Sequence, residues 1–265
     1  MGENFSDYLT DILNKGSLSL MLSIGHRTKL FDIMSSMSPA TFEEIAARSG
    51  LNSRYVKEWL GAMVTGKIVN YDPIKKSFHL SKEKAQYLTS QNSVYDFSAS
   101  MQWIPILAQV EDDIVKCFRF GGGVPYSSYK RFHEVMAEES YQTVVAGLLE
   151  HIIPLVSGLD AQLQSGISVL DVGCGRGRAI NLLAKHYRKS KFTGYDLSDE
   201  AIKDAALDAE SMNNDNAKFM VQNLLTLEPS AKFDLITAFD VIHDQINPQR
   251  TLKFIFDSLE DQGIF

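Results

Sequence analysis

The chain has 265 residues, of which 45% are hydrophobic and 22% are charged, and its formal net charge at pH 7 is −7. This composition predicts a soluble globular protein that is long enough to hold two domains. The charge is uneven, because residues 1–90 carry a net charge of +2 and the remaining residues a net charge of −9, so the acidic C-terminal part is a poor electrostatic match for nucleic acid.

The first 90 residues show the pattern of a winged helix-turn-helix domain. Apolar positions at helical spacing predict a first helix over residues 18–34. Thr41 and Glu44 form a capping box, which opens a second helix. Two short apolar runs on either side of an Asp-Pro turn, residues 67–70 and 77–80, predict the strands of a wing.

A third helix lies between the second helix and the wing, opening at Asn52 or Ser53 and ending near Thr65. Its buried side is expected to consist of Tyr55, Val56, Trp59, Leu60 and Met63. In a winged helix this helix would read DNA, but its exposed cations are only Arg54 and Lys57, and the wing adds two lysines. Such a thin basic surface makes a DNA-binding regulator the less favoured alternative to a packing and dimerisation domain.

The longest apolar stretch near the N-terminus, residues 18–24, is interrupted by two serines. It is too short to span a bilayer and has no secretory cleavage pattern. We therefore expect a cytoplasmic protein without a membrane contact. The two cysteines, Cys117 and Cys174, lack the spacing of metal ligands, so we expect no metal site.

Residues 91–165 are predicted to form a mostly helical linker and substrate cap. Pro105 should kink or restart a helix within this segment. A glycine-rich loop at residues 121–126 precedes a helix expected over residues 129–137. Such a loop is most often a hinge, although a lid over a site would also lie at this kind of position. The candidate substrate contacts are therefore Tyr126, Tyr129 and His133.

From residue 167 onward strands and helices alternate, which predicts a parallel, doubly wound α/β sheet. Four strands are expected, at residues 168–172, 191–195, 217–221 and 233–239. The first strand leads into Asp-Val-Gly-Cys-Gly-Arg-Gly at residues 171–177. Glycines there let the backbone approach a ligand, and the helix that follows, at about 178–186, points its N-terminal amides toward it.

The spacing of the glycines separates two kinds of nucleotide site. The dinucleotide fingerprint needs its third glycine three residues after the second, but that position is Arg178, and the glycine is Gly177. A second acid, Asp196, ends the second strand 25 residues after Asp171. A carboxylate at that place can accept both hydroxyls of a ribose.

These motifs, with Asp-Val-Ile-His-Asp at residues 240–244, resemble the Rossmann-like S-adenosylmethionine-dependent methyltransferases with an N-terminal winged helix, of the bacterial and mycobacterial type. The resemblance runs from about residue 26 to the C-terminus. It implies three parts: a winged helix-turn-helix (1–90), a helical linker and cap (91–165) and a cofactor domain (166–265). It also implies S-adenosyl-L-methionine as cofactor, a small-molecule acceptor methylated at oxygen or nitrogen, and a homodimer formed through the N-terminal domain.

The resemblance assigns cofactor roles residue by residue. The glycine-rich segment would hold the methionine portion, Asp196 would bind the ribose and Leu197 would lie on the adenine. Asn223 stands where many relatives have Asp, and its amide oxygen could still accept a weaker hydrogen bond from the adenine amino group. The full set of expected cofactor contacts is Asp171, Gly173, Cys174, Gly175, Gly177, Asp196, Leu197, Asn223, Leu224 and Phe239.

His243 is the candidate catalytic base, with Asp244 as the partner that orients it. Methyl transfer depends mainly on aligning the acceptor with the methyl carbon, but a hydroxyl or ammonium acceptor must also lose a proton. Histidine is suited to that role near neutral pH. The alternative is that both residues cap the next helix and bond only to backbone.

The chain ends at Gly263-Ile264-Phe265, where the fifth strand of this family would begin. We therefore expect an incomplete sheet, with four strands and the start of a fifth, in a chain truncated at its C-terminus. A non-catalytic or truncated relative that binds the cofactor or a partner is the alternative function.

Overall fold

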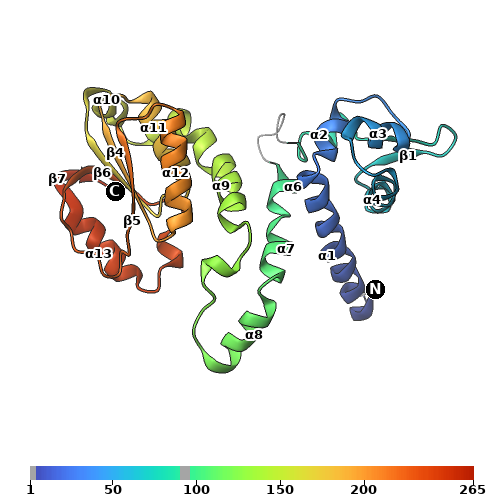
Figure 1. Ribbon diagram of the computed structural model, residues 1–265, viewed down its shortest axis with the longest axis horizontal. Coiled ribbons are helices and arrows are strands. Elements are labelled where there is room, and N and C mark those ends of the chain that lie inside the picture. The colour runs from blue at the N-terminus through green and yellow to red at the C-terminus, as the bar shows by residue number, and fades with distance from the viewer. Residues whose placement is uncertain (1–3, 90–95) are drawn as a thin grey trace. The chain divides into compact units, whose positions relative to one another are not determined.

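The computed structural model describes residues 4–89 and 96–265. It divides into two compact units, Met1–Val135 and Met136–Phe265 (Figure 1). The division falls inside the segment predicted as linker and cap. The boundary predicted between residues 90 and 91 lies outside the described residues.

In the described part of the first unit, the regular elements are helices and one two-stranded hairpin (Figure 1). Its last helix, α9, runs across the division into the second unit. The elements are α1 (Phe5–Arg27), α2 (Leu30–Ser35), α3 (Phe42–Ser49), α4 (Ser53–Thr65), β1 (Asn70–Asp72), β2 (Ser77–His79), α5 (Lys82–Ala85), α6 (Phe97–Ser100), α7 (Trp103–Ala108), α8 (Glu111–Phe120), the 3-10 turn η1 (Tyr126–Ser128) and α9 (Phe132–Thr143).

The prediction of a single first helix over residues 18–34 is wrong. The structure has two helices there, because Lys29 adopts a left-handed backbone conformation (φ 59°) that ends α1 and starts α2. The capping box before α3 is confirmed: the Thr41 amide donates to Glu44 Oε2 at 2.8 Å, and the Glu44 amide donates to Thr41 Oγ1 at 3.3 Å. Reciprocal bonds of this kind satisfy two free amides of the first helical turn.

The core of the winged domain is built around Trp59 on α4. Its ring packs edge-on against Phe31, with 5.2 Å between ring centroids, and its Nε1–H donates to the Met21 carbonyl at 2.9 Å. Tyr55, expected on the same side, is 76% exposed. That expectation is wrong because α4 turns Tyr55 away from the face formed by Val56, Trp59, Leu60 and Met63.

The first wing strand is shorter and later than predicted. Residues 67–69 finish the helical turn instead, since the amides of Ile68 and Val69 both donate to the Met63 carbonyl. The strands β1 and β2 then pair antiparallel, with Tyr71 opposite Phe78. The helix predicted over residues 129–137 also begins late, at Phe132, because Arg131 before it is left-handed (φ 65°).

The second unit is an α/β domain whose five-stranded sheet is parallel throughout, in the order β5-β4-β3-β6-β7 (Figure 1). This confirms the predicted doubly wound class. The elements are the short turns η2 (Val145–Gly147), η3 (Leu148–Ile152, one π-helical turn) and η4 (Ile153–Leu155), followed by α10 (Leu159–Ser165), β3 (Ser168–Val172), α11 (Arg178–His186), β4 (Lys191–Asp196), α12 (Asp199–Ser211), β5 (Ala217–Val221), β6 (Phe233–Thr237), η5 (Ile242–Asp244), α13 (Pro248–Ser258) and β7 (Leu259–Ile264).

Alternate residues of β3 enter two different cores, one on each face of the sheet. Val169 packs with α10 and α11, whereas Leu170 and Val172 pack with α13. This is the two-residue period of a strand that is buried on both sides. Asp171 is two residues after Val169 and therefore lies on the same face of the sheet, the face covered by α11.

The fifth strand, β7, is present but does not begin where the sequence suggested. It starts at Leu259, and the prediction of a start at Gly263 is wrong. Its pairing with β6 is irregular: Phe233 lies opposite Leu259, whereas Leu235 lies opposite Ile264. The strand therefore bulges away from β6 between these two pairs, which breaks the regular pattern that sequence analysis depends on.

Candidate functional site

The glycine-rich loop joins β3 to α11, and each of its three glycines has a positive φ. A Cβ on Gly173 would come within 2.4 Å of Val241, and one on Gly177 within 2.4 Å of the Phe219 ring, but one on Gly175 would meet nothing within 4 Å. Two of the glycines are thus required by close packing inside the protein. The third lies at the open apex of the loop, where a ligand can approach the backbone.

Asp196, at the end of β4, ties this apex to the neighbouring strand. Its Oδ2 accepts a hydrogen bond from the Gly175 amide at 2.8 Å, and its Oδ1 accepts one from the Ser198 amide at 2.8 Å. Each oxygen retains further acceptor capacity. A carboxylate at the carboxyl ends of parallel strands is suited to a ribose. The neighbouring Leu197 is 60% exposed.

Asp171 lies under the loop and is only 3% exposed. Its Oδ1 accepts a hydrogen bond from Thr237 Oγ1, on the adjacent strand β6, at 2.7 Å. Burial raises the pKa of Asp171 to about 7, the Thr237 hydrogen bond opposes that rise, and the charge of Asp196 adds to it. Burial also raises the pKa of the Cys174 thiol, so this side chain is a neutral space-filling group rather than a nucleophile.

The remaining expected cofactor contacts follow β5 and β6. Asn223 Oδ1 accepts a hydrogen bond from the Leu225 amide at 3.0 Å, so its side chain shapes the turn after β5. Leu224 is 8% exposed and belongs to the core on the α13 side of the sheet. Phe239 packs at the edge of the core on the α11 side.

His243 and Asp244 lie on the short turn η5 after β6. His243 Nε2 is 3.3 Å from Asp244 Oδ1, and the two side chains are 68% and 49% exposed. The alternative that they cap the next helix is wrong, because Asn247 caps α13 by accepting from the Arg250 amide at 3.0 Å. Asp240, which precedes this turn, has a left-handed backbone (φ 55°), which is uncommon for a residue other than glycine.

The candidate substrate contacts all belong to an aromatic cluster of the first unit. Phe132 is at its centre, with ring centroids 4.8 Å from Tyr126, 5.9 Å from Tyr129 and 5.4 Å from His133. Trp103 closes the cluster from α7, 5.3 Å from Phe132. The three predicted residues are therefore brought together, around a phenylalanine that sequence analysis did not single out.

The first unit also contains a buried polar cluster around His26 that the sequence did not indicate. His26 Nδ1 lies 3.3 Å from Asp96 Oδ2 and 3.1 Å from Ser98 Oγ, and both His26 and Asp96 are 4% exposed. Burial alone would raise the pKa of Asp96, but the hydrogen bonds of His26 and Ser98 outweigh it and lower that pKa. No sequence signal links these residues, which are about 70 positions apart.

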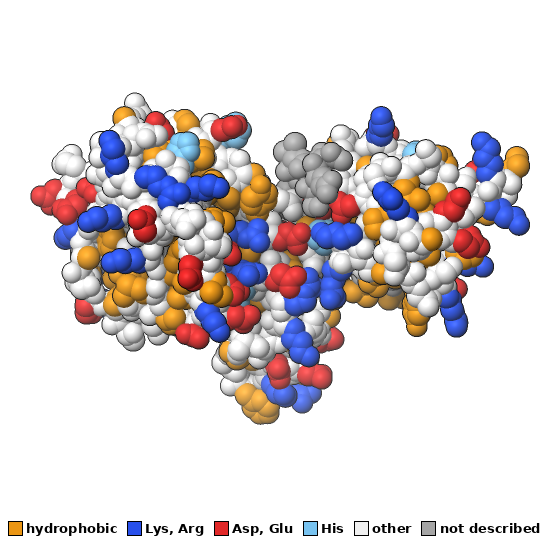
Figure 2. Space-filling model, turned by 45° about the horizontal axis from the view of Figure 1, so that its top comes forward, with side chains coloured by type: hydrophobic (Ala, Val, Ile, Leu, Met, Phe, Trp, Pro, Cys, Tyr) orange, Lys and Arg blue, Asp and Glu red, His pale blue; other side chains and the backbone are white. Residues whose placement is uncertain are grey.

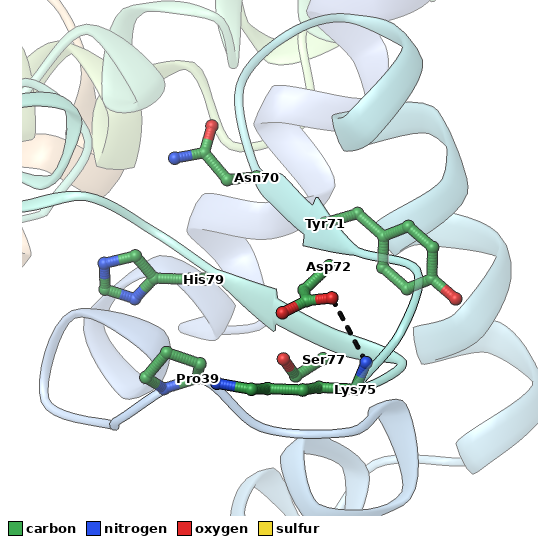
Figure 3. Close-up of a pocket in the computed structure, with 7 residues that line it drawn as sticks. All are labelled: Pro39, Asn70, Tyr71, Asp72, Lys75, Ser77 and His79. Atoms are coloured by element: carbon green, nitrogen blue, oxygen red, sulfur yellow. Dashed lines mark hydrogen bonds between the residues drawn. The ribbon is translucent and has the colours of Figure 1, made fainter.

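A small hollow of about 180 Å³ lies beside the wing. Figure 3 shows Lys75 along one side of it and the Asp72 carboxylate directed at the Lys75 backbone, whose amide donates to that carboxylate at 3.1 Å. None of the predicted site residues contributes to the hollow. Its lining residues are Pro39, Asn70, Tyr71, Asp72, Lys75, Ser77 and His79.

Two further properties of the described residues bear on the sequence predictions. No single helix within residues 4–89 or 96–265 is long and apolar enough to cross a membrane, and only the pair of helical stretches 132–155 and 159–165, bent by 107°, passes such a test by length and composition. Over the same residues, no three His, Cys, Asp or Glu side chains gather in a way that could hold a metal ion.

Fold and loop together define a winged helix followed by a Rossmann-like methyltransferase fold. Comparison with known families agrees: residues 16–90 match the Rv2258c-like winged helix-turn-helix domain, and residues 163–265 match a methyltransferase domain. The chain therefore carries an N-terminal winged helix-turn-helix domain and a C-terminal methyltransferase domain.

Curated relatives match over part of the chain. The (S)-coclaurine N-methyltransferase of Papaver somniferum is 33% identical over 104 residues, which is 39% of this chain and 30% of the relative. A ubiquinone biosynthesis O-methyltransferase of Coxiella burnetii is 36% identical over 89 residues, 33% of this chain and 37% of the relative. The chain thus spans about a third of the length of these relatives.

Solved structures match over the whole chain. Human N-acetylserotonin methyltransferase in complex with SAM superposes with a TM-score of 0.68 at 17% identity, covering 100% of this chain and 80% of that one. A putative O-methyltransferase of Nostoc punctiforme gives 0.74 at 14% identity, covering 99% and 79%. At these identities the likeness establishes the fold.

Proposed function

We propose that the protein is an S-adenosylmethionine-dependent methyltransferase that methylates an oxygen or nitrogen of a small molecule. The observation that carries the proposal is the open glycine apex at Gly175, whose amide is hydrogen-bonded to the Asp196 carboxylate. A backbone that a ligand can approach closely, next to a carboxylate with spare acceptor capacity, fits an adenosyl group and its ribose hydroxyls. The relatives' names, which include both O- and N-methyltransferases, support the reaction class.

The cofactor, when bound, supplies a methyl group on a sulfonium that is already strongly electrophilic. The protein would then hold the cofactor, orient the acceptor and remove the acceptor's proton. Asp196 would hold the ribose and Leu197 would cover the adenine, leaving alignment of the acceptor as the main contribution to rate.

His243 would remove the acceptor's proton. Its Nε2 faces Asp244 Oδ1 at 3.3 Å, so the proton would be taken at Nδ1, and the Asp244 charge would stabilise the imidazolium that results. The open position of the pair on η5 leaves it accessible to an acceptor.

The acceptor would be bound by the aromatic cluster of the first unit. Tyr126, Tyr129 and His133 there combine flat apolar faces with hydroxyl and imidazole groups. Such a lining suits a small molecule with an aromatic or conjugated ring system.

We also propose that the protein is a homodimer that assembles through α1. Exposed apolar side chains form a stripe on one side of this 23-residue helix, over residues 5–13 and again at residues 20 and 24. A second copy of the chain would cover the stripe, because apolar residues at spacings of three and four form the contact face of helix pairs. The exposed apolar side chains of the stripe are Phe5, Tyr8, Leu9, Ile12, Leu13, Leu20 and Ile24.

The charge distribution of the surface supports nucleic-acid binding less than it supports the proposed small-molecule reaction. On the face drawn in Figure 2, lysine and arginine side chains are interspersed with acidic ones over both units. A phosphate-binding surface usually gathers its cations.

Calorimetric titration with S-adenosylhomocysteine tests the cofactor site, with Asp196→Ala as the site variant and Asp215→Ala as the matched control. Asp215 is an exposed carboxylate between α12 and β5. Micromolar binding that only Asp196→Ala abolishes is the expected result, and an acceptor screen with labelled S-adenosylmethionine would follow. A folded protein that binds nothing would refute the proposal and favour a non-catalytic relative.

A further inference from the structure

Two carboxyl groups lie on the same face of the sheet at the carboxyl ends of β3 and β4, because Asp171 pairs with Gly194 and Asp196 follows two residues later. Within the described chain, the hydrogen bonds of Asp171 and Asp196 come from Thr237, Gly175 and Ser198, all of them neutral donors. The loop's own cation, Arg176, is engaged elsewhere, in an ion pair with Asp204 at 2.9 Å. The site thus holds two carboxyl groups without an internal counter-charge.

Burial and the like charge of Asp196, on β4, favour retention of a proton by Asp171, whereas the Thr237 hydroxyl, on β6, opposes it. The Cys174 thiol of the loop is neutral and supplies no counter-charge. The side chain itself is almost fully buried. A buried carboxyl beside a second carboxylate is expected to ionise only when a positive charge arrives, and its pKa of about 7 places that change in the physiological range.

We propose that Asp171 is the proton-linked element of the cofactor site, which gives up its proton to solvent when a ligand with a cationic group binds beside the glycine loop. This inference rests on the proposed function and concerns the same site. The step is a simple ionisation: the carboxyl O–H bond breaks, the proton goes to the buffer, and Thr237 continues to donate to Oδ1. The ligand's ammonium group then supplies the missing counter-charge.

The linkage has a measurable size. A group half protonated at pH 7 that becomes fully ionised on binding releases about half a proton per site at that pH. Release should approach one proton near pH 6 and vanish above about pH 8.5. The affinity for the ligand should therefore rise about tenfold between pH 6 and pH 8.

The test uses S-adenosylhomocysteine as the probe and calorimetry in two buffers of different ionisation enthalpy, at pH 6, 7 and 8. The dependence of the observed enthalpy on buffer counts the protons released. Asp171→Asn should bind without this release. Asp234→Asn is the matched control, because Asp234 is a partly buried acid at the opposite end of β6, bonded to Ser168, and it should release protons as the wild type does.

A third variant, Thr237→Val, keeps the shape but removes the hydroxyl that favours the ionised form. It should move the pH midpoint of the linkage upward, whether or not Asp171→Asn folds. Binding by the wild type without proton release, or release that persists in Asp171→Asn, would overturn the inference and leave the proposed function intact. Failure of the folded wild type to bind at all would refute both.

Discussion

The Gly175 amide donates to the carboxylate of Asp196 at 2.8 Å, so the apex of the glycine loop is held by the acid at the end of the adjacent strand. The two residues are 21 positions apart, and the parallel pairing of β3 with β4 brings them together. In the proposed cofactor site, the shape of the loop and the recognition of the ribose would therefore depend on one another. A change in either residue is expected to disturb both.

The glycines of the loop should differ in their tolerance to alanine. Gly173→Ala places a Cβ 2.4 Å from Val241 at a φ of 70°, and we expect a loss of about 2–4 kcal/mol in the free energy of unfolding. Gly175→Ala has open space and should cost about 1–2 kcal/mol, from backbone strain alone. Urea unfolding measures both. Adding Val241→Ala to Gly173→Ala should recover part of the loss, and no recovery would show that the contact is not the cause.

Removal of the proposed base should affect turnover and leave cofactor binding intact. We expect His243→Ala to lower kcat about 10²- to 10⁴-fold with an unchanged affinity for S-adenosylhomocysteine, because the side chain is 68% exposed. Asp244→Asn should cause a smaller loss in kcat. His186→Ala, an exposed histidine at the end of α11, is the control. Equal turnover in the His243 and His186 variants would remove His243 from the mechanism.

The pH dependence of stability should report on Asp171. Its pKa is raised from 3.8 to about 7 in the folded protein, so the folded state binds more protons than the unfolded state between these values. The ionisation of Asp171 therefore lowers the free energy of unfolding as the pH rises between these two pKa values. Asp171→Asn removes this loss. The Tm of the variant minus that of the wild type should therefore be larger at pH 8 than at pH 4. A gain that is the same at both pH values would contradict the raised pKa.

The buried cluster of the first unit should contribute strongly to its stability. Asp96 caps α6 through the Ser98 and Ala99 amides and also contacts His26. We expect Asp96→Ala to cost about 2–4 kcal/mol in urea unfolding, because it removes a cap and leaves buried donors unsatisfied. Since the pKa of Asp96 is lowered, this contribution should fade as the pH falls through that lowered value. Asp113→Ala, at an exposed acid of α8, should cost little.

The proposed dimer makes a prediction about α1. Leu13 is 71% exposed, so Leu13→Glu should leave the monomer folded but place a charge in an apolar interface. Light scattering after size-exclusion chromatography should then report a monomer where the wild type is a dimer. Asn14→Glu, at an exposed position on the opposite side of the same helix, should remain dimeric. A monomeric wild type would refute the proposal directly.

The sequence predicted best where one local rule decides the structure. The strand Ser168–Val172 and the helix Arg178–His186 occur with the predicted bounds, because a buried apolar run and a glycine turn both act within a few residues. The capping box before α3 is equally local. The first 13 residues of α1, 5–17, were missed because their apolar face is exposed and contributes nothing to a core pattern.

The site was predicted as a list of positions rather than as an arrangement. The Thr237–Asp171 bond depends on the register of β6 against β3, and the His26–Asp96 contact joins distant segments. Neither distance along the chain nor residue type encodes such pairings. The left-handed conformations at Lys29, Arg131 and Asp240 were also missed, because these residue types are not the glycine that usually marks such turns.

The position of the Phe219 ring determines which part of the methyltransferase domain we expect to unfold first. A Cβ at either Gly177 or Gly194 would collide with this ring. The ring therefore packs directly against the glycine loop, and it belongs to β5, the outermost strand on that side of the sheet. An outermost strand has neighbours on one side only and is the first to fray. Fraying of β5 would remove the packing of Phe219 against the loop. The loop would then lose its fixed conformation while the central strands were still paired.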